Sequence, residues 1–438
     1  MRAYDVPSSS PVRRPDGGSP LSVRHVIIEN KEGYPSFANG IHQNTRSLVT
    51  EQTLSGEASR ILFLSRDPHG MTVPAGIRMD HVPLEGLRLL GRTVSLSRRS
   101  REAFLDGADT RTVFHFHGAR QPLLVSLTRM LRRRGIPYVI SLHACFSHFY
   151  DRAGRLVKPS TALYVRLLER RVLEGARFVH VITALEQAEL RRLAPKARSV
   201  LVPHGVYSSA LGGRPGFVDR PGPAGGLLGP AGGLLGPAGG SPVFGFCGRL
   251  ATFHKGLDLL IEGFALYRRQ GGTGRLVVMG PGDEREALAA MALRLGIGSA
   301  VTFEGPRYGA ERDDIVRSWD FFAFPSRLDR WPTAALEAQI LGVPLLITAE
   351  AGMTEAMTRH GAGLLIEDLT AVAVAASLAR AASLDSAEWQ AMSRGAHRMG
   401  CSADWTVVAA RLHALYRTTP ASPALTEDME ATDGSPVL

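Results

Sequence analysis

Two acidic residues in the segment PSRLDRWPTAALEAQILGVP (325–344) have a spacing suited to holding one extended ligand. Asp329 stands shortly before Pro332, which is well placed as the first residue of a helix because its missing N–H is not needed there. Glu337 would then lie about one and a half turns inside that helix. The free backbone amides at the helix start belong to Thr333, Ala334 and Ala335. Such a terminus binds anions through unpaired N–H groups and the positive end of the helix dipole. In isolation, two solvated acids flanking a core helix fit the same residues.

Two cations in the segment GFCGRLATFHKGLDLLIEGF (245–264) are suited to a phosphate group. A strand is expected to end at Phe246, and Lys255 and Gly256 are expected to open the next helix. Arg249 offers a planar fork of donors, and Lys255 offers a point charge. The alternative for Lys255 is a surface charge at a helix start, where the helix dipole disfavours it.

Short apolar runs alternate with amphipathic segments in both halves of the chain, which is typical of buried parallel strands and the helices that cover them. The runs before residue 209 are 23–29, 61–64, 112–117, 138–143 and 178–183, and those after residue 241 are 243–246, 276–279, 301–303, 321–324 and 345–347. Helices are expected at 120–134 and 256–269, each with one apolar face. The alternation predicts an α/β fold of two Rossmann-like, doubly wound domains facing each other across a cleft, with ligands at the carboxyl ends of the strands.

A repeated seven-residue unit, GPAGGLL, fills residues 222–240 and ends in a truncated third copy. Its density of glycine and proline cannot sustain a helix or bury a core, so the segment 209–241 is interpreted as a linker. The expected order is a disordered lead (1–21), an N-terminal Rossmann-like domain (22–208), the linker (209–241), a second Rossmann-like domain (242–401), a C-terminal helix (402–417) and a disordered tail (418–438).

The composition is that of a globular enzyme, with 44% hydrophobic and 21% charged residues among 438. These values exclude a wholly disordered chain, a collagen and a coiled coil. No apolar run approaches the ~18 residues that a membrane-spanning helix needs. The polar N-terminus lacks the apolar core of a secretory signal. Three cysteines lie far apart without a CxxC or CxxH pairing, so the sequence supports neither a disulfide framework nor a zinc cluster, and a reducing cytoplasm fits. No three of the histidines His115, His117, His143 and His180 show metal-ligand spacing.

The charge is unevenly distributed along the chain. Residues 1–220 carry 33 basic and 18 acidic residues (+15), whereas the remainder carries 18 basic and 23 acidic residues (−5). A basic half attracts anionic lipid, acidic sugar or nucleic acid, and a solvated arginine-rich surface accounts for it equally well. No aromatic RNA-binding motif or zinc finger accompanies it, so no nucleic-acid partner is expected.

Five motifs of the second half occur in an order that resembles a known family. They are Gly248-Arg249-Leu250 with Lys255-Gly256, Gly280-Pro281-Gly282, the residues Val301, Phe303 and Gly305, the stretch from Pro325-Ser326 to Glu337-Ala338, and AGMTEAMTRHGAGLLIED (351–368). Over roughly 241–417 the chain is similar to the nucleotide-sugar-binding domain of GT-B glycosyltransferases of retaining family 4. One departure concerns the first acid. Asp329 followed by Arg330 stands where the family usually has Glu and Gly, and the shorter side chain reaches ~1.5 Å less far. This difference bears on recognition of the donor sugar rather than on the reaction class.

The first half resembles the acceptor domain of the same family more loosely. Gly40, in Asn39-Gly40-Ile41, stands for the family's glycine loop after the first strand, and His143 ends a strand as a family histidine does. A core histidine bonded to the backbone is the other interpretation of His143. Three further histidines on apolar strands, His115, His117 and His180, are expected to be structural.

The resemblance implies a retaining transferase that moves a sugar from a nucleoside-diphosphate-sugar donor to an acceptor hydroxyl, in cell-surface polysaccharide or glycolipid synthesis. The implied roles are these: Arg249, Lys255 and the amides of 333–335 hold the departing diphosphate, Asp329 binds sugar hydroxyls, Glu337 binds the ribose and orients the sugar, His143 contacts the sugar or acceptor, and Gly40, Gly280 and Gly305 shape loops at the cleft. The absence of a D-x-D motif implies that no metal or other cofactor takes part.

The implied partners are the nucleotide-sugar and a carbohydrate or lipid-linked acceptor, with the protein in the cytoplasm or peripheral on the inner membrane face. Three alternatives remain at this point. One is another GT-B enzyme, such as a nucleotide-sugar epimerase or a phosphorylase. The second is a catalytically impaired relative, an alternative that rests on Asp329 standing in place of the family's usual Glu. The third is a dinucleotide-dependent oxidoreductase, for which neither half has the required G-x-G-x-x-G after a first strand.

Overall fold

The computed structural model describes residues 21–29, 40–68, 71–143, 163–207, 227–228, 234–235 and 241–418. These residues fall into two compact units. The second unit runs from His204 to Asp404, and the first unit contains the described residues up to Pro203 together with those from Trp405 onward. The chain therefore returns to the first unit at its end. Within the described residues, no helix is long and apolar enough to cross a membrane.

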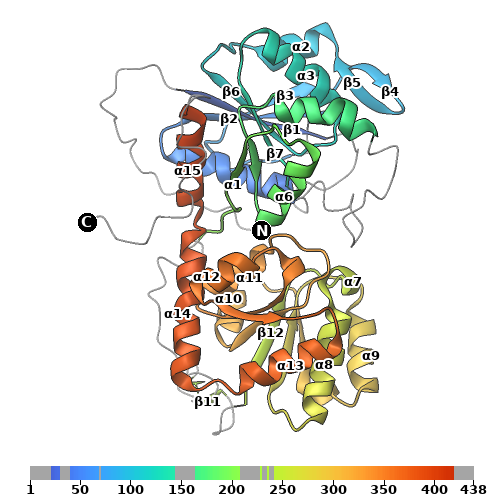
Figure 1. The fold of residues 1–438 in the computed structure, drawn as a ribbon, viewed down its shortest axis with the longest axis vertical. Helices are drawn as coiled ribbons and strands as arrows, with labels where there is room; N and C mark the ends of the chain where they lie inside the picture. The colour runs from blue at the N-terminus through green and yellow to red at the C-terminus, as the bar shows by residue number, and fades with distance from the viewer. Residues whose placement is uncertain are drawn as a thin grey trace, which may run out of the picture. The chain divides into compact units, whose positions relative to one another are not determined.

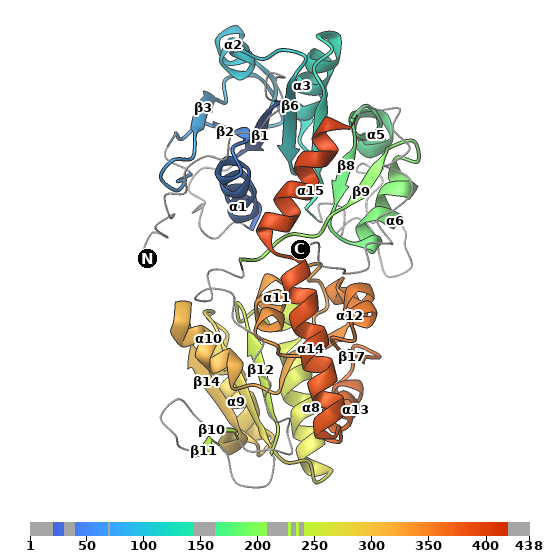
Figure 2. The same cartoon turned by 90° about the vertical axis from the view of Figure 1, so that its left-hand side faces the viewer.

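The first unit is built on a seven-stranded parallel sheet with the order β3-β2-β1-β6-β7-β8-β9 (Figures 1 and 2). Its strands are β1 (Ser22–Ile28), β2 (Ala58–Ser65), β3 (Met79–Pro83), β6 (Thr112–His117), β7 (Tyr138–Ser141), β8 (Val179–Val181) and β9 (Ser199–Leu201). A hairpin outside this sheet pairs β4 (Gly86–Leu89) with β5 (Arg92–Leu96) in antiparallel fashion.

Helices cover both faces of this sheet (Figure 2). They are α1 (Gly40–Leu54), α2 (Arg98–Leu105), α3 (Pro122–Arg133), α5 (Arg170–Glu174), α6 (Ala184–Leu193) and α15 (Trp405–Arg417), with a π-helical turn at Val165–Glu169. The leucine stripe of α3 is buried and its arginines lie on the outer face, as the apolar periodicity predicts. On the opposite face of the sheet, α1 and α15 pack against each other. The sequence predicts the α15 helix, but not the unit to which it belongs.

The second unit is built on a six-stranded parallel sheet with the order β14-β13-β12-β15-β16-β17. Its strands are β12 (Val243–Cys247), β13 (Arg275–Met279), β14 (Val301–Gly305), β15 (Phe321–Phe324), β16 (Leu345–Thr348) and β17 (Gly363–Ile366). Its α-helices are α7 (Thr252–Lys255), α8 (Leu257–Arg269), α9 (Arg285–Arg294), α10 (Gly309–Arg317), α11 (Thr333–Ile340), α12 (Thr354–His360), α13 (Ala371–Ala382) and α14 (Ser386–Ser402), and short 3-10 turns lie at Gly298–Ala300 and Ala349–Ala351. The expectation of two Rossmann-like parallel-sheet units is confirmed.

The strand order changes direction once in each sheet. In the second unit the chain moves outward from β12 to β13 and β14, and then returns to the other side of β12 to form β15. The loops after β12 and β15 consequently leave neighbouring strands toward opposite faces of the sheet. In parallel α/β sheets this switch point is where ligands bind. The motifs at 248–256 and 325–337 both follow these two strands.

The helix predicted at 256–269 is divided in the structure. α7 ends at Lys255, Gly256 adopts a left-handed backbone (φ +68°), and α8 begins at Leu257. A Cβ atom on residue 256 would come within 1.8 Å of the Pro325 carbonyl oxygen, so only glycine permits the loop after β15 to approach this bend. The predicted apolar face of the helix is buried as expected.

Part of the glycine-rich repeat forms regular structure. Leu227–Leu228 and Leu234–Leu235 pair as two short antiparallel strands, which the glycine and proline content did not predict. The expected disordered lead and tail lie outside the described residues, apart from Leu21 and Thr418.

Candidate active site

The turns that follow β12 and β13 are in direct backbone contact. The N–H of Gly248 donates to the carbonyl of Met279 (3.0 Å), and the N–H of Leu250 donates to the carbonyl of Pro281 (2.7 Å). A Cβ atom on Gly280 would lie 1.9 Å from the Gly248 carbonyl oxygen, so the two turns can approach this closely only because residue 280 is glycine. The two glycine-containing motifs therefore form one backbone platform at the carboxyl edge of the sheet.

The three glycines predicted to shape the site lie in different units. The N–H of Gly280 donates to the carbonyl of Gly305 (2.9 Å), which joins the ends of β13 and β14. Gly305 has a left-handed backbone (φ +69°) with open space around its Cα. Gly40 is the exposed first residue of α1 in the first unit. The structure thus brings Gly280 and Gly305 together, and Gly40 belongs elsewhere.

Lys255 and Asp329 form an ion pair, which joins the end of α7 to the loop before α11. Both side chains are largely buried, with 21% and 22% of their surface exposed. The Lys255 ammonium also lies 5.3 Å from the centre of the Phe324 ring, close enough for a cation–π contact. Lys255 is the last residue of α7 and directly precedes Gly256, the N-cap of α8, so its carboxylate and aromatic partners offset the unfavourable dipole of that helix start.

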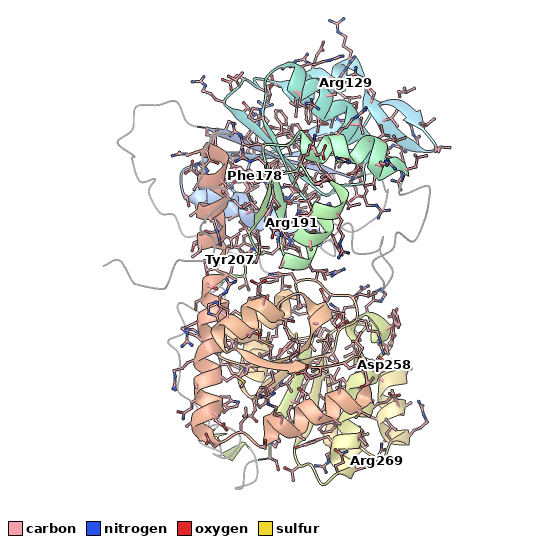
Figure 3. All side chains as sticks on the ribbon, viewed as in Figure 1. Arg129, Phe178, Arg191, Tyr207, Asp258 and Arg269 are labelled. Atoms are coloured by element: carbon pink, nitrogen blue, oxygen red, sulfur yellow. The ribbon has the colours of Figure 1, made fainter. Side chains whose placement is uncertain are left out.

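The loop that carries Asp329 is held in place by internal hydrogen bonds. The buried Ser326 hydroxyl donates to the carbonyl of His254 (2.9 Å) and accepts from the N–H of Asp329 (3.0 Å). Arg327 forms two hydrogen bonds with the carboxylate of Asp258 on α8 (2.7 and 2.8 Å; Asp258 is labelled in Figure 3). These contacts fix Asp329 relative to α7 and α8, so Lys255 and Asp329 are both on rigid elements.

The start of α11 differs in detail from the prediction. Pro332 precedes the helix as its N-cap, and the helix begins at Thr333. The Ala335 N–H donates to the Pro332 carbonyl (3.1 Å), so the expectation that the Ala335 amide is free is wrong. The reason is the 3-10-type bond that tightens the first turn. Among the described residues, the amides of Thr333 and Ala334 have no hydrogen-bond acceptor, and these two remain available to an anion.

Glu337 lies farther along α11 and is paired with an arginine. Arg312 donates to one carboxylate oxygen of Glu337 (2.7 Å) and to Asp313 (2.6 Å). Burial raises the pKa of the Glu337 carboxyl above its ordinary value, and Arg312 opposes that shift. The thiol of Cys247, at the end of β12, has its pKa raised to about 12 by burial and by the nearby Glu337 charge. A thiol in this state is neutral and a poor nucleophile.

Arg249 is exposed on the turn after β12. In the part of the chain that the structure describes, Arg249 forms no ion pair, and its charge lowers the pKa of the Glu284 carboxyl only weakly, after the hydrogen bonds from Thr252. Among the residues that the structure describes, no hydrogen bond or ion pair joins Arg249 to Lys255 or to α11. The joint action of the two cations on one phosphate therefore stays a prediction.

His143 belongs to the first unit and follows β7. Its backbone is in the left-handed region (φ +50°), an uncommon conformation for a residue with a side chain, and one often found at functional sites. Its Nε2 lies 3.0 Å from Nδ1 of His117. Burial lowers the pKa of His143 to about 3, so its imidazole is neutral at physiological pH.

Three histidines of the first unit that the sequence did not single out as a group come together in the structure. Nitrogen atoms of His25, His115 and His117 lie within 4.8 Å of one another. The parallel pairing of β1 with β6 places His25 beside His115, a neighbourhood that spacing along the chain does not reveal. All three imidazoles are buried.

Sequence reasoning missed two groups that organise the site. Arg312 came from the segment ERDD (311–314), where nothing in the spacing indicates a partner for Glu337. His25 was missed because it stands alone on its strand. The alternation His115-Phe116-His117 was a usable signal, because residues two apart on a strand share one face of the sheet.

Comparisons with known proteins agree with this geometry. Residues 241–383 match the family model described as glycosyl transferases group 1, and residues 39–205 match the model described as glycosyl transferase 4-like domain. The chain carries a group 1 glycosyl transferase domain and a glycosyl transferase 4-like domain. These domains confirm the resemblance predicted from the ordered motifs of the second half.

Two curated relatives illustrate the similarity. The D-inositol 3-phosphate glycosyltransferase of Thermobispora bispora is 30% identical over 296 residues, which is 65% of each chain. The mannosylfructose-phosphate synthase of Agrobacterium fabrum is 30% identical over 190 residues, which is 41% of each chain. The aligned part of this chain thus spans less than two thirds of these relatives.

Solved structures share the fold over most of the chain. Sucrose-phosphate synthase from Thermosynechococcus elongatus superposes with a TM-score of 0.64 at 19% identity, over 91% of this chain and 98% of that one. The Anabaena protein HepE, solved in complex with UDP, superposes with a TM-score of 0.63 at 14% identity, over 90% and 98%. These likenesses confirm the GT-B fold of this chain.

Proposed function

We propose that the protein transfers a sugar from a nucleoside-diphosphate-sugar to an acceptor hydroxyl with retention of configuration. The observation that carries this proposal is the Lys255–Asp329 pair, held on rigid elements at the switch point of the second sheet and followed by the open amides of α11. A cation and a helix start together suit a diphosphate, and a carboxylate beside them suits sugar hydroxyls. UDP and UDP-glucose are bound in the Anabaena structures of the same fold.

The chemical problem is the charge that develops during transfer. The bond from the anomeric carbon to the diphosphate oxygen breaks, a bond to the acceptor oxygen forms, and the acceptor proton goes to the departing phosphate. Groups that stabilise the negative charge of the leaving diphosphate lower the barrier, because that charge grows in the transition state. Lys255, Arg249 and the amides of Thr333 and Ala334 would supply this stabilisation without a metal ion or other cofactor. The amide of Ala335 does not contribute, because its N–H already donates to the carbonyl of Pro332.

Two carboxylates would hold the donor on either side of the diphosphate. Arg312 occupies one oxygen of Glu337. The other oxygen has no hydrogen-bond donor among the described residues, which leaves it able to accept from a ribose hydroxyl. Asp329 would accept from hydroxyls of the sugar. Because Asp329 also holds Lys255, the sugar and the phosphate would be recognised by two groups that are already oriented by each other. His143 would contact the sugar or the acceptor.

A screen of nucleotide-sugars tests this function directly. Binding at about 100 times Kd stabilises a protein by about 2.7 kcal/mol, which moves the melting temperature by several degrees. We expect one of the UDP-, GDP- or ADP-sugars to give this shift, and the same donor to be hydrolysed or transferred with release of the nucleoside diphosphate. Lys255→Met should abolish the shift, whereas Lys196→Met, at an exposed lysine of the first unit, should retain it. A wild-type protein that responds to no nucleotide-sugar would contradict the proposal.

For the acceptor, we propose a lipid-linked or anionic molecule at a membrane surface, in polysaccharide or glycolipid synthesis. The support is a surface of the first unit around the β4–β5 hairpin. Leu87, Leu89 and Leu90 there are 67%, 64% and 95% exposed. Beside them is a pocket of about 890 Å³ lined by apolar side chains and arginines, with Glu102 as an acidic member. Its arginines are Arg92, Arg98, Arg101, Arg129, Arg133 and Arg134, of which Arg129 is labelled on α3 in Figure 3.

Exposed leucines beside a pocket lined by arginines have the chemistry of a surface that enters the headgroup region of anionic lipid. We expect the protein to float with vesicles that contain phosphatidylglycerol and to stay behind with pure phosphatidylcholine. Leu90→Ser should weaken flotation, and Leu293→Ser, at an exposed leucine of α9, is the matched control. Equal flotation of the two variants would contradict the proposal that the acceptor is at a membrane surface. So would a wild-type protein that does not float with anionic vesicles at low salt.

A further inference from the structure

A row of polar side chains lies buried beneath α1 and α15 in the first unit. His25 on β1, His115 and His117 on β6, and His180 on β8 are all buried. The sheet register pairs His25 with His115 and carries the row across Ser141 of β7. The opposite face of the same strands, with Phe114 and Phe116, is mainly apolar core, with the buried Arg24 guanidinium stacked on Phe114. A layer of four imidazoles on one side of a Rossmann-like sheet requires an explanation, because buried polar groups are costly unless every one is hydrogen-bonded.

Two of these imidazoles, those of His25 and His117, form a chain that runs from Gln52 to His143. Nε2 of His25 lies 2.8 Å from Oε1 of Gln52 on α1, and Nδ1 of His25 lies 2.9 Å from Nε2 of His117. Nδ1 of His117 lies 3.0 Å from Nε2 of His143. The Ser59 hydroxyl also donates to Oε1 of Gln52 (2.9 Å). The rings of His25 and His117 therefore each use one nitrogen toward Gln52 and the other toward His143.

The direction of this chain follows from its first member. The amide oxygen of Gln52 can only accept, so Nε2 of His25 carries the proton and donates to it. A neutral imidazole then has its other nitrogen free to accept, so His117 must donate from Nε2 to Nδ1 of His25. By the same step, His143 must donate from Nε2 to Nδ1 of His117. Burial lowers the pKa of each ring, with His25 at about 4, so the rings are neutral and the argument holds at physiological pH.

A second chain in the same layer has an equally definite direction. The Tyr416 hydroxyl of α15 and Nδ1 of His115 are 2.6 Å apart, and Nε2 of His115 is 2.6 Å from the Ser141 hydroxyl. The Ser141 hydroxyl lies 2.6 Å from Nδ1 of His180, and Nε2 of His180 lies 2.6 Å from the carbonyl of Val202. Because that carbonyl can only accept, donation runs from Tyr416 through to Val202. His115 is fully occupied by this second chain, and the two chains meet where the Gln52 side chain also bonds the Tyr416 hydroxyl.

The close approach of His25, His115 and His117 also raises the question of a metal ion. A cation would need a lone pair from each ring. Nε2 of His117 instead carries the proton donated to His25 at 2.9 Å, and both nitrogens of His115 are engaged. No carboxylate is among the three side chains to balance a buried double charge. The geometry therefore favours hydrogen-bonded neutral rings over a metal centre.

We propose that Gln52, His25 and His117 are positioning residues that fix the tautomer of His143, with the proton on Nε2 and with Nδ1 as a hydrogen-bond acceptor. The consequence is chemical selectivity at one atom. Nδ1 of His143 accepts from a hydroxyl and repels a carboxylate or phosphate oxygen. The part of the proposal that assigns a sugar hydroxyl to this atom rests on the proposed transferase function, whereas the tautomer itself does not.

The test is nitrogen NMR of the full chain labelled with ¹⁵N-histidine, without any donor. Long-range proton–nitrogen correlations distinguish a protonated ring nitrogen from an unprotonated one, and the His143 signals are those lost in His143→Asn. We expect Nε2 of His143 to be protonated and Nδ1 not. The opposite assignment in the wild-type protein overturns the proposal without any variant having to fold. Because no substrate is present, this result stands or falls independently of the transferase activity.

Variants then test whether the relay imposes the tautomer. Gln52→Met removes the amide oxygen, which can accept but not donate a hydrogen bond. We expect the His143 signals then to become those of a mixture of tautomers. Thr45→Val is the control, because it removes another buried hydrogen bond of α1, to Ile41 (2.8 Å), outside the chain. An unchanged His143 spectrum in a folded Gln52→Met protein overturns the positioning role. So does a stoichiometric shift of the His25 and His117 signals on adding Zn²⁺, which would instead establish a metal site. For a donor found in the screen, Gln52→Met should weaken binding about tenfold, the equivalent of about 1.4 kcal/mol.

Discussion

The buried imidazole layer makes the first unit sensitive to acid. Burial lowers the pKa of His25 and His180 to about 4 and that of His143 to about 3, and it lowers those of His115 and His117 well below the ordinary value. In the unfolded chain each ring would titrate near its ordinary value of about 6.5. Between these values the unfolded chain binds protons that the folded unit does not. The folded unit is therefore fully stable above about pH 6.5 and loses stability as the pH falls toward the folded values.

The size of the effect follows from the number of rings. Each neutral buried imidazole lowers the free energy of unfolding by about 1.4 kcal/mol for each pH unit below about 6.5. Five rings together give about 7 kcal/mol per pH unit. Because a typical domain has about 5–15 kcal/mol of stability, the first unit should unfold within about one to two pH units below pH 6.5. We expect loss of its native structure near pH 5.

The assay must report on the first unit alone. Urea unfolding followed by pulsed hydrogen exchange, with mass spectrometry of peptides from β1 and β6, gives the free energy of unfolding of that unit at each pH. Replacing one ring, as in His180→Gln, should reduce the pH slope by about 1.4 kcal/mol per unit, whatever it does to absolute stability. Phe104→Leu removes volume from the apolar face without removing a titrating group, and its slope should equal that of the wild type. A flat free energy between pH 7.5 and 5.5 would refute the reasoning, because it would mean that the rings are protonated alike in both states.

Three further predictions concern the second unit. Asp329→Asn should strengthen the binding of a nucleoside diphosphate without sugar severalfold, as measured by calorimetry, because Lys255 then loses its carboxylate partner and is available to the phosphates. Weaker binding would show instead that the ion pair is needed to hold the lysine in place. Glu337→Gln should lower the free energy of unfolding by about 1 kcal/mol and raise the donor KM, because a charge-assisted hydrogen bond to its arginine is weakened; an unchanged KM would exclude the ribose role. Gly256→Ala should lower the free energy of unfolding of the unit by more than about 2 kcal/mol, because the new Cβ atom would meet the loop after β15. Gly271→Ala is the control, since Gly271 has a similar backbone conformation but open space around it, and it should cost about 1 kcal/mol. Equal losses of the two variants in urea unfolding would contradict the steric argument.

Much of the candidate site could be predicted from the chain because its motifs are local. Gly280 and Gly256 mark bends with left-handed or extended geometry that only glycine tolerates, and such requirements are visible one residue at a time. The helix start after Pro332 was equally local, although the assignment of its free amides erred by one residue at Ala335. Helix ends depend on whether the first turn tightens, and spacing alone does not settle that. The pairing of Lys255 with Asp329 was not predicted, since 74 positions separate them and each had been given a role toward the ligand.

The alternation of apolar runs and amphipathic segments, by itself, determined that this protein is an α/β chain with two parallel sheets, because burial on both faces of a strand and on one face of a helix leaves a periodic signature in the residues themselves. Only the tertiary structure decided which residues meet across strands and helices. His25, His117 and Gln52 come from separate elements, and parallel pairing and helix packing bring them within hydrogen-bond distance. Such contacts depend on register and on the direction in which each strand is added to the sheet. The return of α15 to the first unit, which supplies Tyr416 to the buried layer, is of the same kind: a contact between residues 301 positions apart leaves no trace in any local pattern.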